Sequence, residues 1–228
     1  MPRTEFKPEL HGFHFGNYFI NRLVRLPRGK AVTSAGRCGG MSYAALDCFY
    51  ARRPVPLNRS EEFAPAYVPP DGTRLADYIW KRQIDSLLRA TSLKFLTWSF
   101  IPNQPTALFA GVTRWTKERE FPKLRASIDR GQPAVLVLIK ASGLAGMMTN
   151  HQVVAIGYDY EPAEEDIRIY LYDSNHPDTE VALRSSRDMP HFRMSTGEEW
   201  RGFHVHAYKP KLPPDLATGA AAIRRQAI

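Results

Sequence analysis

The sequence predicts an α+β fold in which a helical part is followed by a largely antiparallel sheet. Two observations lead to this class: segments with helical spacing of apolar residues lie before residue 131, and short β-branched and aromatic segments lie after it. Because helices and strands are segregated along the chain, we expect the helices to pack against one sheet. We expect a single domain over residues 1–209, with its helical part at about 1–131, its sheet part at about 132–209, and a flexible tail at 210–228.

The helical part is expected to begin with an irregular segment, residues 1–35, which is rich in aromatic residues, arginine and glycine. A helix should then start at Cys38 and stop before Pro54. The apolar positions with helical spacing in this helix are Met41, Ala44, Ala45, Cys48 and Phe49. This spacing predicts that one face of the helix lies in the core.

Residues 53–73 hold five prolines and one glycine, which predicts a long loop; these residues are Pro54, Pro56, Pro65, Pro69, Pro70 and Gly72. Two further helices are expected in "TRLADYIWKRQIDSLLRA", residues 73–90, and "EREFPKLRASIDRG", residues 118–131. Pro122 is tolerated near a helix start, and Gly131 is a suitable stop. The predicted strands are "PAVLVLI" (133–139), "HQVVAIGYDY" (151–160), "DIRIYLYD" (166–173), "EVALRSS" (180–186) and "WRGFHVHAYK" (200–209).

The net charge and the hydropathy of the chain limit the classes of protein to which it could belong. The net charge is +8, but no Lys/Arg block, zinc-finger motif or RNA-binding aromatic motif accompanies it, so nucleic acid is not the expected partner. No apolar run approaches the ~20 residues of a membrane span. The first residues, "MPRTEFKPELHGFHFG", lack the apolar core of a signal peptide. We therefore expect a cytoplasmic protein, and signal-independent export remains an alternative.

The two cysteines should not pair with each other. If Cys38 and Cys48 lie on one helix, their Cα atoms are about 15 Å apart. A disulfide needs Cα atoms within about 7 Å, and neighbouring ligands of one structural zinc would be equally too distant. Two unpaired thiols fit a reducing compartment. Cys48 falls on the apolar face of the helix, so we expect it in the core.

Cys38 has the setting of a reactive thiol. A helix N-terminus lowers a thiol pKa through its N–H groups and dipole, and Arg37 could add to this effect. A nucleophile also needs a base, and His151 opens a strand. If the two strands that follow form a hairpin, Asp173 at the end of the second lies beside His151 and can orient it. The sequence therefore predicts a Cys38–His151–Asp173 site.

Other candidate ligands are weaker. "HVH" at 204–206 places two histidines on one face of a strand, and His11 and His14 share a helical spacing, but no third metal ligand accompanies either pair. We therefore expect no metal and no cofactor. Trp98 and Trp115 could line a cleft or pack in the core.

Three segments resemble a known family: "GRCGGMSYAALDCF", "HQVVAIGYD" and "IYLYDSNHP" are similar to the three motifs of papain-like cysteine peptidases. The branch they resemble most is that of the peptidases that process bacteriocins with double-glycine leaders. The resemblance covers about residues 30–180 and has the same order of Cys, His and Asp. It implies a papain-like fold in which a central helix bearing Cys38 packs on the sheet. It also implies catalytic roles for Cys38, His151 and Asp173.

Two positions depart from the family. A glutamine that helps to hold the oxyanion commonly precedes the cysteine, but "KAVTSAG" stands there. Ser34, Asn17 or Asn21 would have to replace it, or the Cys38 N–H would act largely alone. The aspartate is followed by Ser174 and Asn175 in place of proline. Asn175 is therefore an alternative orienting group, since papain uses Asn.

The resemblance implies hydrolysis of a peptide or related amide bond through a thioester, with a peptide or protein as substrate. Two alternatives remain open. The missing glutamine makes a papain-like acyltransferase or a catalytically inactive binding domain credible. The positive charge leaves a basic nucleic-acid-binding module as the other alternative.

Overall fold

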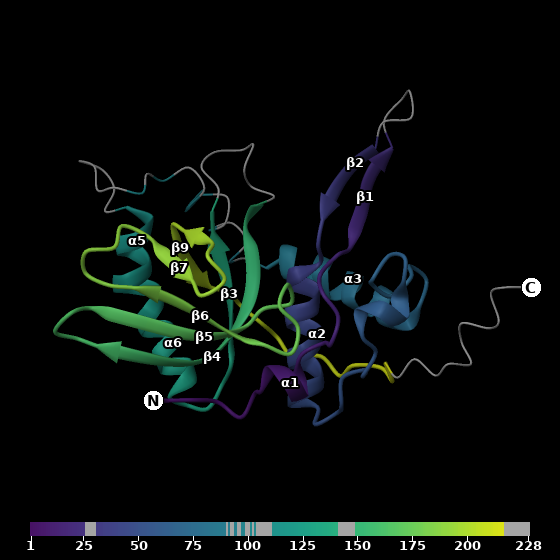
Figure 1. Ribbon diagram of the computed structural model, residues 1–228, viewed down its shortest axis with the longest axis horizontal. Helices are drawn as coiled ribbons and strands as arrows, with labels where there is room; N and C mark the ends of the chain where they lie inside the picture. The colour runs from purple at the N-terminus through teal and green to yellow at the C-terminus, as the bar shows by residue number, and fades with distance from the viewer. Residues whose placement is uncertain are drawn as a thin grey trace, which may run out of the picture.

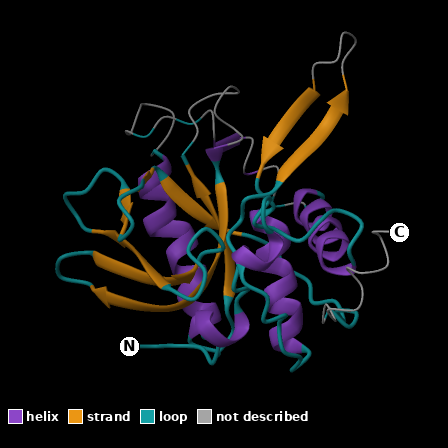
Figure 2. Ribbon diagram, turned by 45° about the vertical axis from the view of Figure 1, so that its right-hand side comes forward, coloured by secondary structure: helices purple, strands orange, loops and turns teal. Residues whose placement is uncertain are grey.

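The computed structural model describes residues 1–25, 31–89, 91, 94, 97–98, 101, 103, 111–140 and 149–216. For residues 22–25 and 31–35 it describes the backbone alone. Within these ranges the fold is α+β, as predicted, with helices on both sides of an antiparallel sheet (Figures 1 and 2).

The main sheet of the described chain has seven strands in the order β8–β7–β6–β5–β4–β3–β9, and every neighbouring pair is antiparallel. Its strands are β3 (Ala134–Ile139), β4 (His151–Glu161), β5 (Asp166–Tyr172), β6 (Glu180–Ser185), β7 (Phe192–Met194), β8 (Glu199–Trp200) and β9 (Gly202–Val205). The strand predictions correspond to β3, β4, β5, β6 and β8–β9. Strand β7 was not predicted because its three residues are too few for a period of two to be visible.

The described helices are α1 (Pro8–His11), α2 (Cys38–Tyr50), α3 (Arg74–Leu87), α5 (Val112–Trp115) and α6 (Phe121–Ile128). A 3₁₀ turn at Ser60–Phe63 interrupts the predicted loop, and a π turn at Thr116–Glu120 leads into α6. Apolar side chains of the sheet alternate between two cores. Val135 and Val154 face the core around α2, whereas Leu136 and Val153 face the core around α6.

Helices α2 and α3 lie against each other at the start of α2. A Cβ atom on Gly40 would lie 2.1 Å from the carbonyl oxygen of Ile79, so only glycine permits this approach. The Gly40 N–H donates to Gln83 Oε1 of α3 at 2.8 Å. This close packing fixes the first turn of α2, which carries Cys38.

The expectation of an irregular segment over residues 1–35 is wrong for residues 20–25 and 31–35, whereas residues 1–19 are irregular apart from α1. Strands β1 (Ile20–Arg25) and β2 (Ala31–Ala35) form an antiparallel hairpin that projects from the body of the molecule beside α2 (Figures 1 and 2). A register shift between Arg22 and Val24 makes a β-bulge in β1. The bulge disrupts the regular alternation by which a strand is recognised in sequence.

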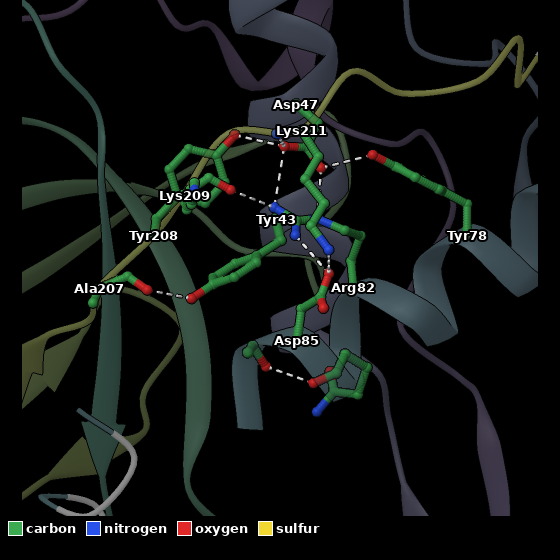
Figure 3. Close-up of polar contacts among 11 residues, drawn as sticks. Tyr43, Asp47, Tyr78, Arg82, Asp85, Ala207, Tyr208, Lys209 and Lys211 are labelled. Carbon is green, nitrogen blue, oxygen red and sulfur yellow. Dashed lines mark hydrogen bonds and ion pairs between the residues drawn. The ribbon is translucent and has the colours of Figure 1, made fainter. Parts of the chain in front are cut away.

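In the expected tail, residues 210–216 contact the helical part, while residues 217–228 lie outside the described part. The chain after β9 crosses α2 and α3, where the fully buried Asp47 and Arg82 form an ion pair at 2.6 Å (Figure 3). Tyr208 Oη and the Lys211 N–H donate to Asp47 Oδ1 at 2.7 and 2.8 Å. Leu216 is buried in the core around α2. Buried charge on the helices therefore holds this segment.

Among the described helices, none combines the length and the apolar character that a membrane crossing requires.

Candidate active site

Three element ends meet at one point, namely the start of α2, the start of β4 and the end of β5. His151 is the first residue of β4, and Asp173 directly follows β5. The terminal pair of β4 with β5 joins Val154 to Tyr172, so Asp173 lies diagonally across from His151. Its Oδ1 lies 2.7 Å from His151 Nε2. The structure therefore brings together the two residues that the hairpin argument placed side by side.

The thiol of Cys38 lies on the other side of the His151 ring. His151 hydrogen-bonds to the Cys38 side chain, and because its Nε2 is occupied by Asp173, Nδ1 is the nitrogen that faces the sulfur. The Gln152 N–H donates to Cys38 Sγ at 3.4 Å. Cys38 is partly exposed, whereas His151 and Asp173 are 7% and 2% exposed. Cys38 is thus the most accessible residue of the series.

The electrostatics favour charge separation between Cys38 and His151. Burial opposes ionisation of Cys38, but the hydrogen bond and charge of His151 outweigh it, so the Cys38 pKa lies below the ordinary thiol value of 9.0. Burial also disfavours the imidazolium, yet the carboxylate of Asp173 and the thiolate raise the His151 pKa above 6.5. Burial disfavours the Asp173 carboxylate too, but His151 holds its pKa below the ordinary range. A thiolate–imidazolium–carboxylate series follows from these three shifts.

Trp200 covers the His151 ring. The two rings stack with centroids 6.2 Å apart and an interplanar angle of 25°, and Trp200 is 5% exposed. The ring shields the His151–Asp173 hydrogen bond from water, which strengthens it. Sequence reasoning missed this residue, because a tryptophan at a strand gives no local signal of its packing partner.

Asn17 and Asn175 meet beside the site. Asn175 donates its backbone N–H to Asp173 Oδ1 at 2.8 Å, and its exposed side chain accepts from Asn17 Nδ2 at 3.3 Å. Asp173 is therefore the residue bonded to His151, and Asn175 supports Asp173 through its backbone. Asn17 Oδ1 in turn accepts the Arg37 N–H at 2.6 Å, which places the Asn17 amide one residue before Cys38.

Arg37 points away from the thiol. Its side chain is 5% exposed and donates to Asn21 Oδ1 at 2.7 Å and to Asp71 Oδ1 at 2.7 Å. Its positive charge is therefore paired with Asp71 and does not stabilise the thiolate of Cys38. Asn21, a candidate oxyanion donor, directs its Nδ2 at the Gly36 carbonyl at 2.8 Å. The hydrogen bonds of both residues fix the loop before α2.

The remaining oxyanion candidates are the Ser34 side chain, which lies outside the described part, and the Cys38 backbone. Within the described chain, the Cys38 N–H has no hydrogen-bond partner, whereas the Arg37 and Gly40 N–H groups are taken by Asn17 and Gln83. A free N–H at a helix start is suited to binding a developing negative charge.

The other predicted candidates are engaged elsewhere. His206 is bonded to Thr91 and to the Ser86 carbonyl, and His204 is fully buried against Trp98. Burial lowers the His204 pKa to about 4. His14 pairs with Asp178, and His11 accepts the Lys7 N–H.

No group of three metal-ligating side chains occurs in the described chain. Trp98 is buried and lies against Trp115, so it packs in the core. Cys48 is buried in the core as predicted, and burial raises its pKa to about 12. Both cysteines are free.

Comparison of the chain with models of protein families, with curated proteins and with solved structures finds no significant match.

Proposed function

We propose that the protein is a papain-like cysteine hydrolase that cleaves a peptide or related amide bond. The observation that carries the proposal is the position of His151 between a partly exposed cysteine, Cys38, and a buried carboxylate, Asp173. A structural cysteine needs neither a lowered pKa nor a hydrogen-bonded histidine, and Cys48 in the same helix has neither.

The first half of the reaction makes an acyl-enzyme. The Cys38 thiolate attacks the substrate carbonyl carbon, and the carbonyl oxygen takes the negative charge of the tetrahedral intermediate. His151 Nδ1, protonated in the ion pair, gives its proton to the leaving amine as the C–N bond breaks. A thioester on Cys38 and a free amine result. Asp173 holds the ring so that Nδ1 faces the sulfur and stabilises its positive charge.

The second half releases the acid. Neutral His151 takes a proton from water, the resulting hydroxide attacks the thioester carbonyl, and the C–S bond breaks to return the Cys38 thiolate. The acid product and the original ion pair are formed. The same chemistry with an amine or an alcohol in place of water would be acyl transfer.

The oxyanion is held, in this proposal, by the Cys38 N–H and by Asn17 Nδ2. The oxygen end of the Asn17 amide is fixed by the Arg37 N–H, so its NH₂ end is directed away from Arg37. Its bond to Asn175 is 3.3 Å long, at the weak end of the range, and can be exchanged for a charged oxygen. Asn17 would thus replace the glutamine that the chain lacks before Cys38.

Labelling with an epoxysuccinyl peptide, which reacts with activated thiolates, tests the proposal. We expect one adduct, on Cys38, that is lost in Cys38→Ala and in His151→Ala and retained in Cys48→Ala. Peptide mapping by mass spectrometry locates it. Labelling of Cys48, or equal labelling of Cys38 with and without His151, would rule out the proposed ion pair.

A further inference from the structure

The β1–β2 hairpin is a small sheet of its own. Its strands pair with each other, and within the described chain neither pairs with the seven-stranded sheet. A two-stranded hairpin is only marginally stable in water. Within the described chain, each strand has a strand partner along one edge alone, and an open edge readily accepts a further strand. The hairpin projects from the body in both views, so these edges are not covered by the layers of the fold (Figures 1 and 2).

The two edges are not equivalent. The register shift between Arg22 and Val24 places the bulge in β1, where Leu23 has no partner in the pairing. A bulge bends a strand and interrupts its edge. Strand β2 has no extra residue, so Ala31–Ala35 offers the regular edge.

The regular edge leads directly to the nucleophile. Two residues, Gly36 and Arg37, lie between the end of β2 and Cys38, so the Cα atoms of Ala35 and Cys38 are at most about 10 Å apart. The loop between them is fixed: the Gly36 N–H donates to the Phe19 carbonyl at 2.7 Å, and Asn21 of β1 donates to the Gly36 carbonyl. A chain paired with β2 would therefore be held in a defined position relative to the thiol.

The charge of the hairpin indicates which chain would pair with it. Residues 20–35 contain three arginines and one lysine and no acidic residue. Arg22 and Arg25 belong to β1, whereas Arg28 and Lys30 lie outside the described residues. Basic residues near a binding edge attract an acidic partner and speed its encounter. They also keep two copies of this hairpin from pairing with each other.

We propose that β2 binds an extended, acidic polypeptide segment as a third strand and thereby presents it to Cys38. The identification of this segment as a substrate rests on the proposed hydrolase function, but its binding does not. Main-chain hydrogen bonds to β2 supply affinity, and the positive charge supplies selectivity. The acidic stretch would lie beside the bond that is cleaved.

Fluorescence anisotropy of a labelled twelve-residue peptide that alternates glutamate and valine tests the proposal. Binding is measured on the full chain carrying Cys38→Ala, so that no covalent reaction contributes. Two other peptides serve as probes: the same sequence with every backbone nitrogen methylated, and one with lysine in place of glutamate. The first retains charge but loses main-chain donors.

Two kinds of variant locate the binding. Replacing residues 22–33 with Asn-Gly joins Asn21 to Ser34, which face each other in the hairpin, and leaves its base intact. Arg22→Gln with Arg25→Gln removes two charges from β1. The matched control, Lys7→Gln with Arg130→Gln, removes two charges at exposed positions whose side chains have no bonding partner in the described chain.

We expect the shortened hairpin and the methylated peptide each to weaken binding at least tenfold. The Arg22/Arg25 variant should weaken it about three- to tenfold at low salt, and the control less than twofold. The proposal would be overturned if the methylated peptide or the lysine peptide bound as tightly as the glutamate peptide. It would also be overturned if the shortened hairpin bound the glutamate peptide unchanged, or if the dissociation constant of that peptide were millimolar or weaker. Tighter hairpin-dependent binding of a DNA oligonucleotide would overturn it in favour of nucleic acid.

Alkylation of Cys38 separates this proposal from the hydrolase. The shortened hairpin with Cys38 intact should react with iodoacetamide at the original rate. If Cys38 does not react but peptide binding still depends on the hairpin, the hydrolase proposal is ruled out and the proposal that β2 binds a peptide stands.

Discussion

The side-chain oxygen of Asn17 accepts the backbone N–H of Arg37 over 2.6 Å, although twenty residues separate them in the chain. The β1–β2 hairpin lies between the two positions in the sequence, and its second strand ends beside the start of its first strand. An amide from far upstream is thereby placed next to Cys38, at a position where the preceding segment offers no glutamine.

Removing this amide should slow catalysis without changing the thiol. We expect Asn17→Ala to reduce kcat on a cleaved peptide by about 10²- to 10³-fold, since one oxyanion donor is lost. Alkylation of Cys38 at neutral pH should change less than threefold. Asn58→Ala removes an amide that is bonded to Glu62 instead and should leave kcat unchanged. An unaltered kcat in Asn17→Ala would leave the Cys38 N–H as the donor.

Neutralising Asp173 should weaken the thiolate–imidazolium pair. In Asp173→Asn the burial of His151 is no longer offset by a carboxylate, so the His151 pKa falls and the Cys38 pKa rises. We expect alkylation at pH 6 to slow at least tenfold. Asn175→Ala keeps the backbone N–H that bonds to Asp173 and should have little effect. A larger effect of Asn175→Ala than of Asp173→Asn would reverse the assignment of the orienting residue.

The pH dependence follows from the signs of the two shifts. Cys38 has a lowered pKa, so its thiolate persists at pH values well below 9.0, and His151 has a raised pKa, so its proton is lost only well above 6.5. The rate of hydrolysis should therefore rise with pH as Cys38 ionises, form a plateau, and fall at alkaline pH as His151 loses its proton.

Iodoacetamide alkylation followed by peptide mass measures the acid limb: Cys38 should react at pH 6 while Cys48 stays protected. In His151→Ala the limb should move up by more than one pH unit. Two cysteines that react only after unfolding would make Cys38 a packing residue.

The buried pair of Asp47 and Arg82 should contribute strongly to stability. Asp47→Ala removes the buried ion partner of the fully buried Arg82, which keeps its bond to Asp85, and removes the acceptor for Tyr208 and the Lys211 N–H (Figure 3). We expect the free energy of unfolding to fall by about 3–5 kcal/mol in urea titrations. Glu118→Ala breaks an exposed pair with Arg114 and should cost less than about 0.5 kcal/mol. Similar losses in both variants would contradict this account.

The approach of α3 to α2 should not tolerate a side chain at position 40. In Gly40→Ala the new Cβ would lie 2.1 Å from the Ile79 carbonyl oxygen, so the helices must separate. We expect a loss of at least about 1–3 kcal/mol and a changed alkylation rate of Cys38, because the first turn of α2 moves. In Gly72→Ala the new Cβ would meet no atom within 4 Å, so this variant tests only the positive φ of residue 72. It should leave the alkylation rate of Cys38 unaffected.

The sequence by itself determined the parts of the fold that depend on local spacing. The apolar period after Cys38 predicted α2, and the β-branched run after His151 predicted β4. The strand-to-strand return that brings Asp173 to His151 was also predictable, because a hairpin joins neighbours in sequence. Residue types and position in the helix made Cys38 the candidate for a reactive cysteine, since a thiol at a helix start and a core thiol such as Cys48 differ in local sequence pattern.

Only the tertiary structure decided which side chains surround these residues. The direction of Arg37, the packing of Trp200 on His151 and the return of Asn17 depend on how distant elements lie against one another. The docking of residues 210–216 depends on a charge pair formed between two helices. Propensity and periodicity act over a few residues, whereas these contacts join positions from 20 to more than 100 residues apart, and packing of the whole chain selects them.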